Sequence, residues 1–184
     1  QELNFRDGYA TIALGEPGKQ TNVRFWVEEG RPVVVAEIDS DLDLAPRATS
    51  ELWRSEPREV IPKGEVGDLF WNRGAIEVYP DVVLGADKMR PLEAIGWYHR
   101  NVETPYFMEN IKVQGLEDAP TLKNPLPNRT FGALVFCDAP VWESETALAA
   151  KPGKSHRFDV VAYCEQMETL DQWFDATLKI ADEA

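Results

Sequence analysis

Aromatic, amide and charged side chains gather between Phe70 and Arg100, and this stretch is the part of the sequence best equipped to bind a ligand. A flat aromatic ring offers a face for stacking, and amide, guanidinium and carboxylate groups fix the orientation of a polar ligand. The candidate ligand-binding residues are Trp71, Asn72, Arg73, Glu77, Trp97, Tyr98, His99 and Arg100. The competing interpretation is structural: the tryptophans belong to the core or to sheet edges, and Glu77 faces solvent on an alternating strand.

The same stretch contains a carboxylate pair, Glu77 and Asp81, of the kind that a glycoside hydrolase requires. Other catalytic signals are absent from the sequence, which has neither a Gly-x-Ser-x-Gly nucleophile turn nor a glycine-rich phosphate loop. We therefore assign no catalytic residue and expect no cofactor. An enzyme built from scattered carboxylates, His99 and Arg100 stays as an alternative.

The sequence offers few histidine ligands for a metal ion, because His99 and His156 are the only two histidines. Together with Glu103 or Asp159 they could form a site with two histidines and one carboxylate. Their spacing matches no compact ligand motif, and no pair of cysteines has the short spacing of a zinc site. We therefore expect no metal.

Charge and hydropathy exclude two classes of function. Acidic residues number 32 and basic residues 19, so the net charge of −13 repels phosphate backbones, and no Lys/Arg cluster counters it. Apolar runs are only a few residues long, whereas a membrane span needs about 18. We expect no nucleic-acid partner and no membrane span. The expected partner is a small polar ligand or a protein.

The two cysteines and the first residue bear on the compartment. Cys137 and Cys164 lie near the ends of two predicted strands and could face each other across a sheet, either as a disulfide or as two reduced thiols. The chain begins with Gln1, which is too large for the usual removal of an initiator Met. This favours a secreted or periplasmic protein slightly over a cytoplasmic one, although a chain trimmed from a longer one would begin in the same way.

Two-residue alternation predicts strands through most of the chain. Residues 9–15, 22–28 and 32–38 are joined by short turns and form an antiparallel meander. Further strands are expected at 68–72, 75–84, 94–99, 106–114, 130–137 and 158–164. Short helical segments are expected at 49–53 and 145–150.

The clearest helix closes the chain, at residues 169–183. Thr169 and Gln172 have the spacing of a capping box. Apolar residues then recur at helical intervals on one face, which predicts that the helix packs on the core. These are Leu170, Trp173, Phe174, Leu178 and Ala181.

We therefore predict a single domain, residues 1–184, with a mainly β fold. The expected architecture is an antiparallel β-sandwich or open barrel with a C-terminal amphipathic helix, and the alternative is an α+β fold. The preferred function is a non-enzymatic module that binds a carbohydrate, a small polar ligand or a protein. A structural or assembly subunit of a homo- or hetero-oligomer is the second hypothesis. A hydrolase or isomerase based on carboxylates and histidine is the third.

Overall fold

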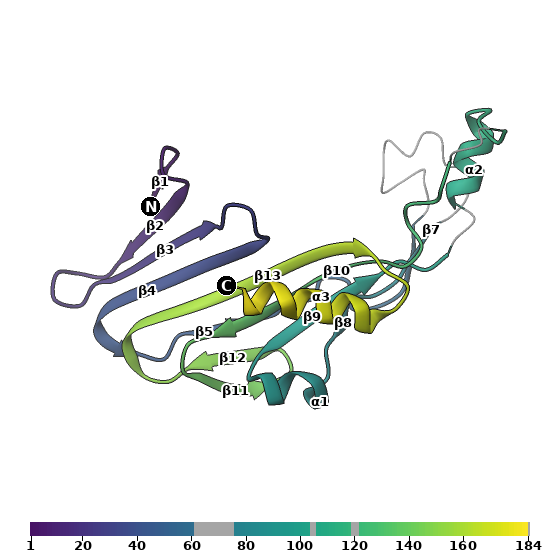
Figure 1. The fold of residues 1–184 in the computed structure, drawn as a ribbon. Coiled ribbons are helices and arrows are strands. Elements are labelled where there is room, and N and C mark those ends of the chain that lie inside the picture. Colours follow the sequence, from purple (N-terminus) through teal and green to yellow (C-terminus); the bar gives the residue numbers. More distant parts are fainter. Residues whose placement is uncertain (61–75, 104–105, 119–121, 184) are drawn as a thin grey trace.

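The framework of the protein is an eight-stranded antiparallel sheet (Figure 1). The computed structural model describes residues 1–60, 76–103, 106–118 and 122–183. The strand order is β1-β2-β3-β4-β13-β10-β9-β8, so the sheet is open, with β1 at one edge and β8 at the other. In this order the strands are β1 (Glu2–Asn4), β2 (Tyr9–Leu14), β3 (Thr21–Val27), β4 (Val33–Leu44), β13 (Gly153–Gln166), β10 (Arg129–Cys137), β9 (Ile95–Arg100) and β8 (Val82–Val83).

The first strands form the predicted antiparallel meander, which is confirmed. The turn between β2 and β3 uses Gly15 and Gly18, whose φ angles of 90° and 83° lie in the left-handed region that glycine adopts without strain. The long strand β13 then joins this meander to the second half of the sheet, because it pairs with β4 on one side and β10 on the other.

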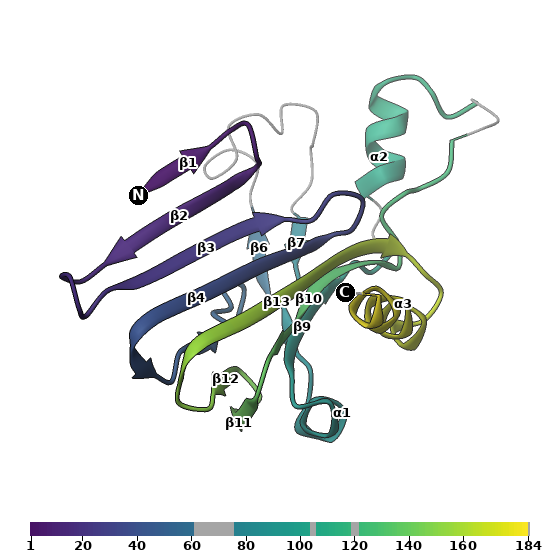
Figure 2. The ribbon, with the colours of Figure 1, turned by 60° about the vertical axis from the view of Figure 1, so that its left-hand side comes forward.

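Smaller elements surround the large sheet. A three-stranded sheet has the order β11 (Pro140–Ser144), β12 (Ala147–Ala150) and β5 (Arg47–Thr49), and a two-stranded sheet pairs β6 (Arg58–Val60) with β7 (Ile76–Val78). The helices are α1 (Ala86–Met89), a 3-10 helix at Arg90–Leu92, α2 (Tyr106–Val113) and α3 (Leu170–Asp182). Helix α2 stands away from the large sheet, whereas α3 lies along one of its faces (Figures 1 and 2).

Helix α3 supplies much of the core, as its apolar stripe predicts. Trp173 is completely buried, and Phe174 packs with it against Leu134 of β10. The indole nitrogen of Trp173 donates to the carbonyl of Tyr163, 3.2 Å away, so its polar group is satisfied inside the core. Thr169 and the Gln172 side chain form the expected capping box. The prediction of a mainly antiparallel β fold with a C-terminal helix is confirmed.

Two local predictions made between residues 106 and 150 are wrong. Residues 106–114, predicted as a strand, form helix α2, because the spacing of Phe107 and Ile111 also fits one helical turn. Residues 145–150, predicted as a helical turn, contain strand β12 instead. All four residues of β12 are buried and its neighbours β11 and β5 satisfy its backbone, so packing overrides the helix propensity of alanine.

Two further corrections concern the first half of the chain. Residues 49–53 form no helix, because β5 pairs with β12 up to Thr49 and an irregular segment follows. The strand predicted at 75–84 is divided into β7 and β8, and Pro80 lies in the break between them. The strand predicted at 68–72 lies outside the described residues.

The two cysteines are free thiols and do not face each other. Both lie on adjacent strands, but Cys137 pairs with Phe158 while Cys164 pairs with Phe131. The two cysteines are thus separated along the strands by six residues, or roughly 20 Å at the usual rise of a strand, which is too far for a disulfide. Within the described parts of the chain, no helix is long and apolar enough to cross a membrane.

Candidate functional site: a tryptophan-lined pocket

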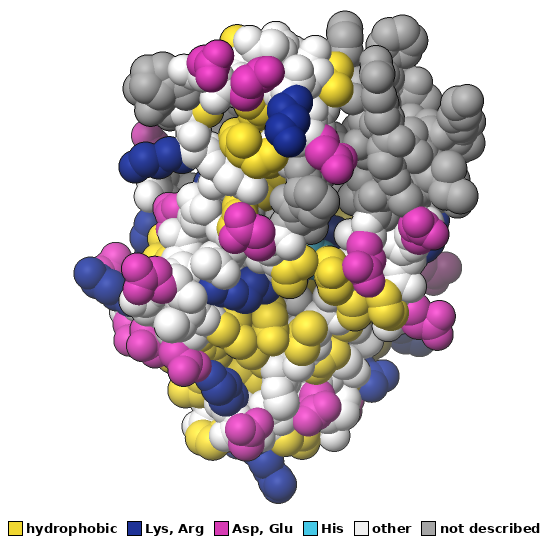
Figure 3. Space-filling model, turned by 90° about the vertical axis from the view of Figure 1, so that its right-hand side faces the viewer, with side chains coloured by type: hydrophobic (Ala, Val, Ile, Leu, Met, Phe, Trp, Pro, Cys, Tyr) yellow, Lys and Arg dark blue, Asp and Glu magenta, His cyan; other side chains and the backbone are white. Residues whose placement is uncertain are grey.

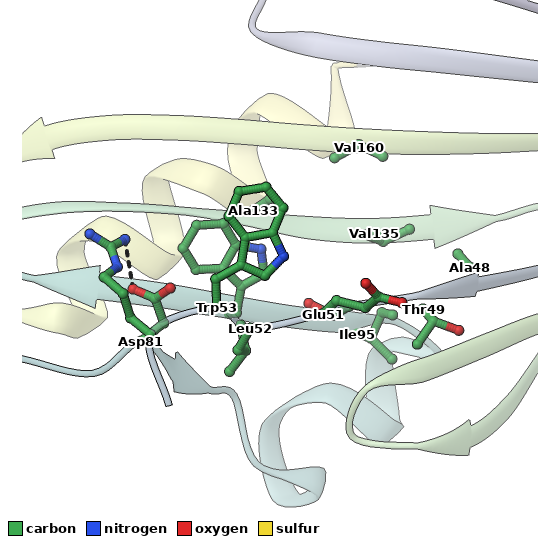
Figure 4. Close-up of a pocket in the computed structure, with 13 residues that line it drawn as sticks. Ala48, Thr49, Glu51, Leu52, Trp53, Asp81, Ile95, Ala133, Val135 and Val160 are labelled. Carbon is green, nitrogen blue, oxygen red and sulfur yellow. Dashed lines mark ion pairs between the residues drawn. The ribbon is translucent and has the colours of Figure 1, made fainter. Parts of the chain in front are cut away.

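A pocket of about 720 Å³ lies on the face of the large sheet opposite α3 (Figure 4). One side is formed by the strap, residues 48–54, which begins in β5 and continues past its end. The floor is formed by strands β9, β10 and β13. The lining residues are Ala48, Thr49, Ser50, Glu51, Leu52, Trp53, Arg54, Asp81, Ile95, Trp97, Ala133, Val135 and Val160.

Strand register explains why the floor is apolar. Val160 of β13, Val135 of β10 and Ile95 of β9 are direct neighbours across the sheet, so their side chains lie on the same face. Ala133 and Trp97 form the next such row towards the Asp81 end of the pocket. We call the side of the sheet that carries these residues the pocket face, and the side covered by α3 the helix face.

Two indoles give the pocket its aromatic character. Trp97 is fixed in the floor, where its ring meets Phe131 edge to face with centroids 6.2 Å apart. Trp53 belongs to the strap, and its side chain lies in front of the floor strands (Figure 4). Trp53 is 93% exposed, which is unusual for so large an apolar side chain. Figure 3 shows the molecule from another side, the right-hand side of Figure 1, where hydrophobic side chains gather in an area bordered by charged side chains.

A cluster of Arg54, Asp81 and His99 closes one end of the pocket. Nη2 of Arg54 lies 2.7 Å from Oδ1 of Asp81, and Nδ1 of His99 donates to the same oxygen at 3.1 Å. The side chains of Asp81 and His99 are both only 7% exposed. Phe131 supports the cluster, since the His99 ring stacks on it at 4.9 Å and the Arg54 guanidinium lies over it at 5.2 Å.

His99 is electrostatically unusual. Burial lowers its pKa below the ordinary value of 6.5, and the neighbouring Arg54 charge lowers it further, while Asp81 and Asn101 oppose the shift. His99 is therefore neutral at pH 7, with its Nδ1 proton directed at Asp81. The cluster then carries one positive and one negative charge, so the buried Asp81 carboxylate is compensated by the partly exposed Arg54 guanidinium.

Strand β9 divides the predicted site between two faces. Trp97 and His99 lie on the pocket face, where both contact Phe131. Tyr98 lies on the helix face and packs on Trp173, with ring centroids 6.2 Å apart. Consecutive residues of a strand point to opposite faces, so these three candidates cannot all contact one ligand.

Arg100, also on the helix face, has a structural environment. Its guanidinium donates to the carbonyls of Asn128, Met167 and Glu168 and to the hydroxyl of Thr130. These contacts fasten the chain where β13 leads into α3. His99 and Arg100, which the enzymatic hypothesis places in one site, therefore lie on opposite sides of the sheet.

The remaining candidates lie elsewhere. Glu77 is exposed on β7, accepts a hydrogen bond from the Tyr79 hydroxyl at 2.8 Å and lines a separate depression of about 430 Å³. That hydrogen bond raises the pKa of Tyr79. Asp81 lines the Trp53 pocket instead, so the two carboxylates expected to act as a pair lie in different depressions. Trp71, Asn72 and Arg73 lie outside the described residues.

The histidines are also separate. His156 is buried on β13, and its Nε2 donates to the carbonyl of Gly153 at 2.9 Å. Among the residues that the structure describes, no three His, Cys, Asp or Glu side chains are grouped so that they could hold a metal ion.

Sequence reasoning did not identify Trp53 and Arg54 as ligand-binding candidates. A usable signal was present: the run Glu51-Leu52-Trp53-Arg54 places a tryptophan between charged residues in a loop-rich stretch, where a core role is less expected. The expectation of a short helix at 49–53 concealed that signal.

Comparison with curated proteins finds no match for this chain. Comparison with solved structures finds none either. A family model described as "Domain of unknown function (DUF5703)" matches residues 1–184, the full length of the chain. The chain therefore belongs to the DUF5703 family.

Proposed function

We propose that this domain is a non-enzymatic binding module that holds a carbohydrate or a similar small polar ligand in the Trp53 pocket. The observation that carries the proposal is the exposed indole of Trp53 beside an apolar floor and the ion pair between Arg54 and the buried Asp81 carboxylate. An aromatic side chain of this size buries at least 150 Å² when covered, which corresponds to about 4 kcal/mol of hydrophobic free energy. A ligand that covers Trp53 would gain part of that free energy.

The chemistry of the lining suits a sugar ring. A pyranose has apolar C–H faces, which can lie against Trp53, Trp97 and Ile95, and hydroxyl groups at its edge. Polar partners for those hydroxyls are available in the strap, from Thr49, Ser50 and Glu51. Arg54 adds a guanidinium with five N–H donors, only some of which the Asp81 contact occupies. The volume of the pocket also falls in the usual range for small-ligand sites.

Charge favours a neutral ligand. With His99 neutral, the charged residues of the lining are Glu51, Arg54 and Asp81, which sum to −1. The chain as a whole carries −13. Both fields repel an anionic sugar such as a uronic acid. We therefore expect neutral saccharides to bind better than acidic ones.

A ligand panel tests the proposal. Thermal shift followed by calorimetry would compare neutral oligosaccharides with oligouronides, since a ligand that binds only the native state raises the melting temperature. We expect a shift with at least one neutral saccharide and loss of binding in Trp53→Ala. Phe5→Ala is the matched control, because Phe5 is also an exposed aromatic, 88% accessible, but lies outside the pocket. Equal binding by wild type and Trp53→Ala would refute the proposal, as would a panel with no shift.

Assembly through the pocket face is a second candidate function, favoured by a separate observation. Leu3 and Phe25 share one register row on this face, Val27 belongs to the next row, and all three are exposed. Adjacent exposed apolar side chains are typical of protein contact surfaces. Light scattering tests this: a dimer that Val27→Lys dissociates would support it, and a monomer at high concentration would refute it.

A further inference from the structure

The strap is attached to the rest of the fold at both ends. At its start, β5 pairs with β12, and the Ser50 amide donates to the carbonyl of Thr146 at 2.8 Å. At its end, the Asp81 amide donates to the carbonyl of Arg54 at 2.8 Å. Between these two attachments, residues 51–53 pass along the pocket and present Trp53.

The second attachment contains a side-chain ion pair in addition to the backbone hydrogen bond. Asp81 bonds Arg54 through its carboxylate as well as through its backbone. The carboxylate oxygen that receives Arg54 also receives the Nδ1 proton of His99, which is fixed on β9. Asp81 therefore connects the strap directly to the floor of the pocket.

Burial makes this connection stronger than an ordinary surface ion pair. The Asp81 side chain is almost completely covered, whereas Arg54 is partly exposed. A carboxylate in that environment is poorly hydrated, so it depends on its two partners for compensation. Phe131 restricts both partners, since Arg54 and His99 each lie against its ring.

We infer that Asp81 is a positioning residue for the ligand site. Its carboxylate, oriented by His99, holds Arg54 and thereby keeps Trp53 beside the pocket. This inference rests on the proposed function for its biological meaning. The attachment of the strap can be measured without any ligand, so the inference about Asp81 and the proposed function can fail independently.

Limited digestion with trypsin tests the attachment on the full chain. Trypsin cleaves after Arg54 only when the guanidinium enters the specificity pocket of the protease, which the Asp81 contact prevents. Mass spectrometry would follow cleavage between Arg54 and Ser55, with cleavage after Lys19, in the β2–β3 turn, as an internal reference. In Asp81→Asn we expect cleavage after Arg54 to accelerate about tenfold while cleavage after Lys19 is unchanged, as for local opening of one segment.

Matched variants separate positioning from general stability. Asp171→Asn makes the same change of charge in an exposed ion pair with Lys88, and we expect no acceleration at Arg54. Asp81→Glu keeps the carboxylate and should restore most of the protection. If Asp81→Asn folds poorly, Arg54→Lys keeps the protease site and the Asp81–His99 contact but removes the guanidinium, and cleavage there should also accelerate. Unchanged cleavage at residue 54, or equal acceleration at Lys19, would overturn the inference.

Discussion

Trp53 and Trp173 lie on opposite sides of the large sheet and at opposite extremes of exposure. Trp53 is 93% exposed beside the pocket face, and Trp173 is 0% exposed against the helix face. The same residue type therefore has two roles in one chain. The Trp173 indole is part of the core and has its hydrogen bond satisfied by the Tyr163 carbonyl, whereas the apolar area of the Trp53 indole is exposed to solvent.

The contrast predicts unequal effects of truncation on stability. Trp173→Ala should lower the free energy of unfolding by roughly 3 to 5 kcal/mol, because a large cavity opens between α3 and the sheet. Trp53→Ala should change it by less than about 0.5 kcal/mol, as for an exposed side chain. Urea unfolding measures both values. A destabilisation of several kcal/mol by Trp53→Ala would show that Trp53 belongs to the core.

Gly132 is predicted to be intolerant of any side chain. A Cβ atom there would lie 2.1 Å from the carbonyl oxygen of Trp97 and 2.7 Å from Cα of Tyr98, so β9 would have to move. We expect Gly132→Ala to lower the free energy of unfolding by at least about 2 kcal/mol, within the range for overpacking. Gly153→Ala is the milder control, because the nearest atom is a His156 side-chain carbon at 3.3 Å. Equal stabilities of the two variants would contradict the close approach of β9 and β10.

His99 should make stability depend on pH. Its pKa is lowered in the folded state, so the unfolded chain binds the proton more readily. The contribution of neutral His99 is complete above its ordinary pKa of 6.5 and is lost as the pH falls through the folded value. Urea unfolding between about pH 7.5 and pH 5 should show this loss, and His99→Gln should reduce it. An identical pH profile in wild type and His99→Gln would count against the buried, neutral histidine.

The two thiols should differ in reactivity. Burial raises the pKa of Cys137 to about 11, assisted by Asp138 and Glu93, so this thiol stays protonated at neutral pH. Cys164 is exposed. A thiol reagent such as dithionitrobenzoate should modify Cys164 at least about tenfold faster than Cys137 in the native protein. Cys137→Ser and Cys164→Ser identify the two phases, and a faster Cys137 would contradict the structure.

The strands of the meander were correctly predicted and pair locally. Strands β9, β10 and β13 were also predicted, although they pair across longer separations in the chain. Short turns connect β2, β3 and β4, so alternation of apolar residues was sufficient to predict the meander. The predictions failed where long-range contacts decide the conformation. Ala147–Ala150 is a strand because β11 and β5 enclose it, and no property of four consecutive residues reveals β5, which lies about a hundred residues earlier in the chain.

The pocket, like strand β12, depends on contacts between residues that are far apart in the chain. Trp97 and His99 were recognisable as candidates because they lie in an aromatic and charged run. The sequence did not reveal that Arg54 and Asp81 lie beside Trp97 and His99, because the strap and β9 come into contact only after the sheet has formed. The alternation of β9 also placed half of its run, Tyr98 and Arg100, on the helix face.

The central claim is that a neutral saccharide occupies the pocket between Trp53 and the sheet, and side-chain NMR tests it most directly. The six tryptophans give six indole N–H resonances in a ¹⁵N-labelled sample, which single Trp→Phe variants assign. Titration with neutral oligosaccharides should shift the Trp53 and Trp97 resonances and leave Trp173 unmoved. If saturating additions leave the Trp53 and Trp97 resonances unshifted, or shift the Trp173 resonance instead, the account is contradicted.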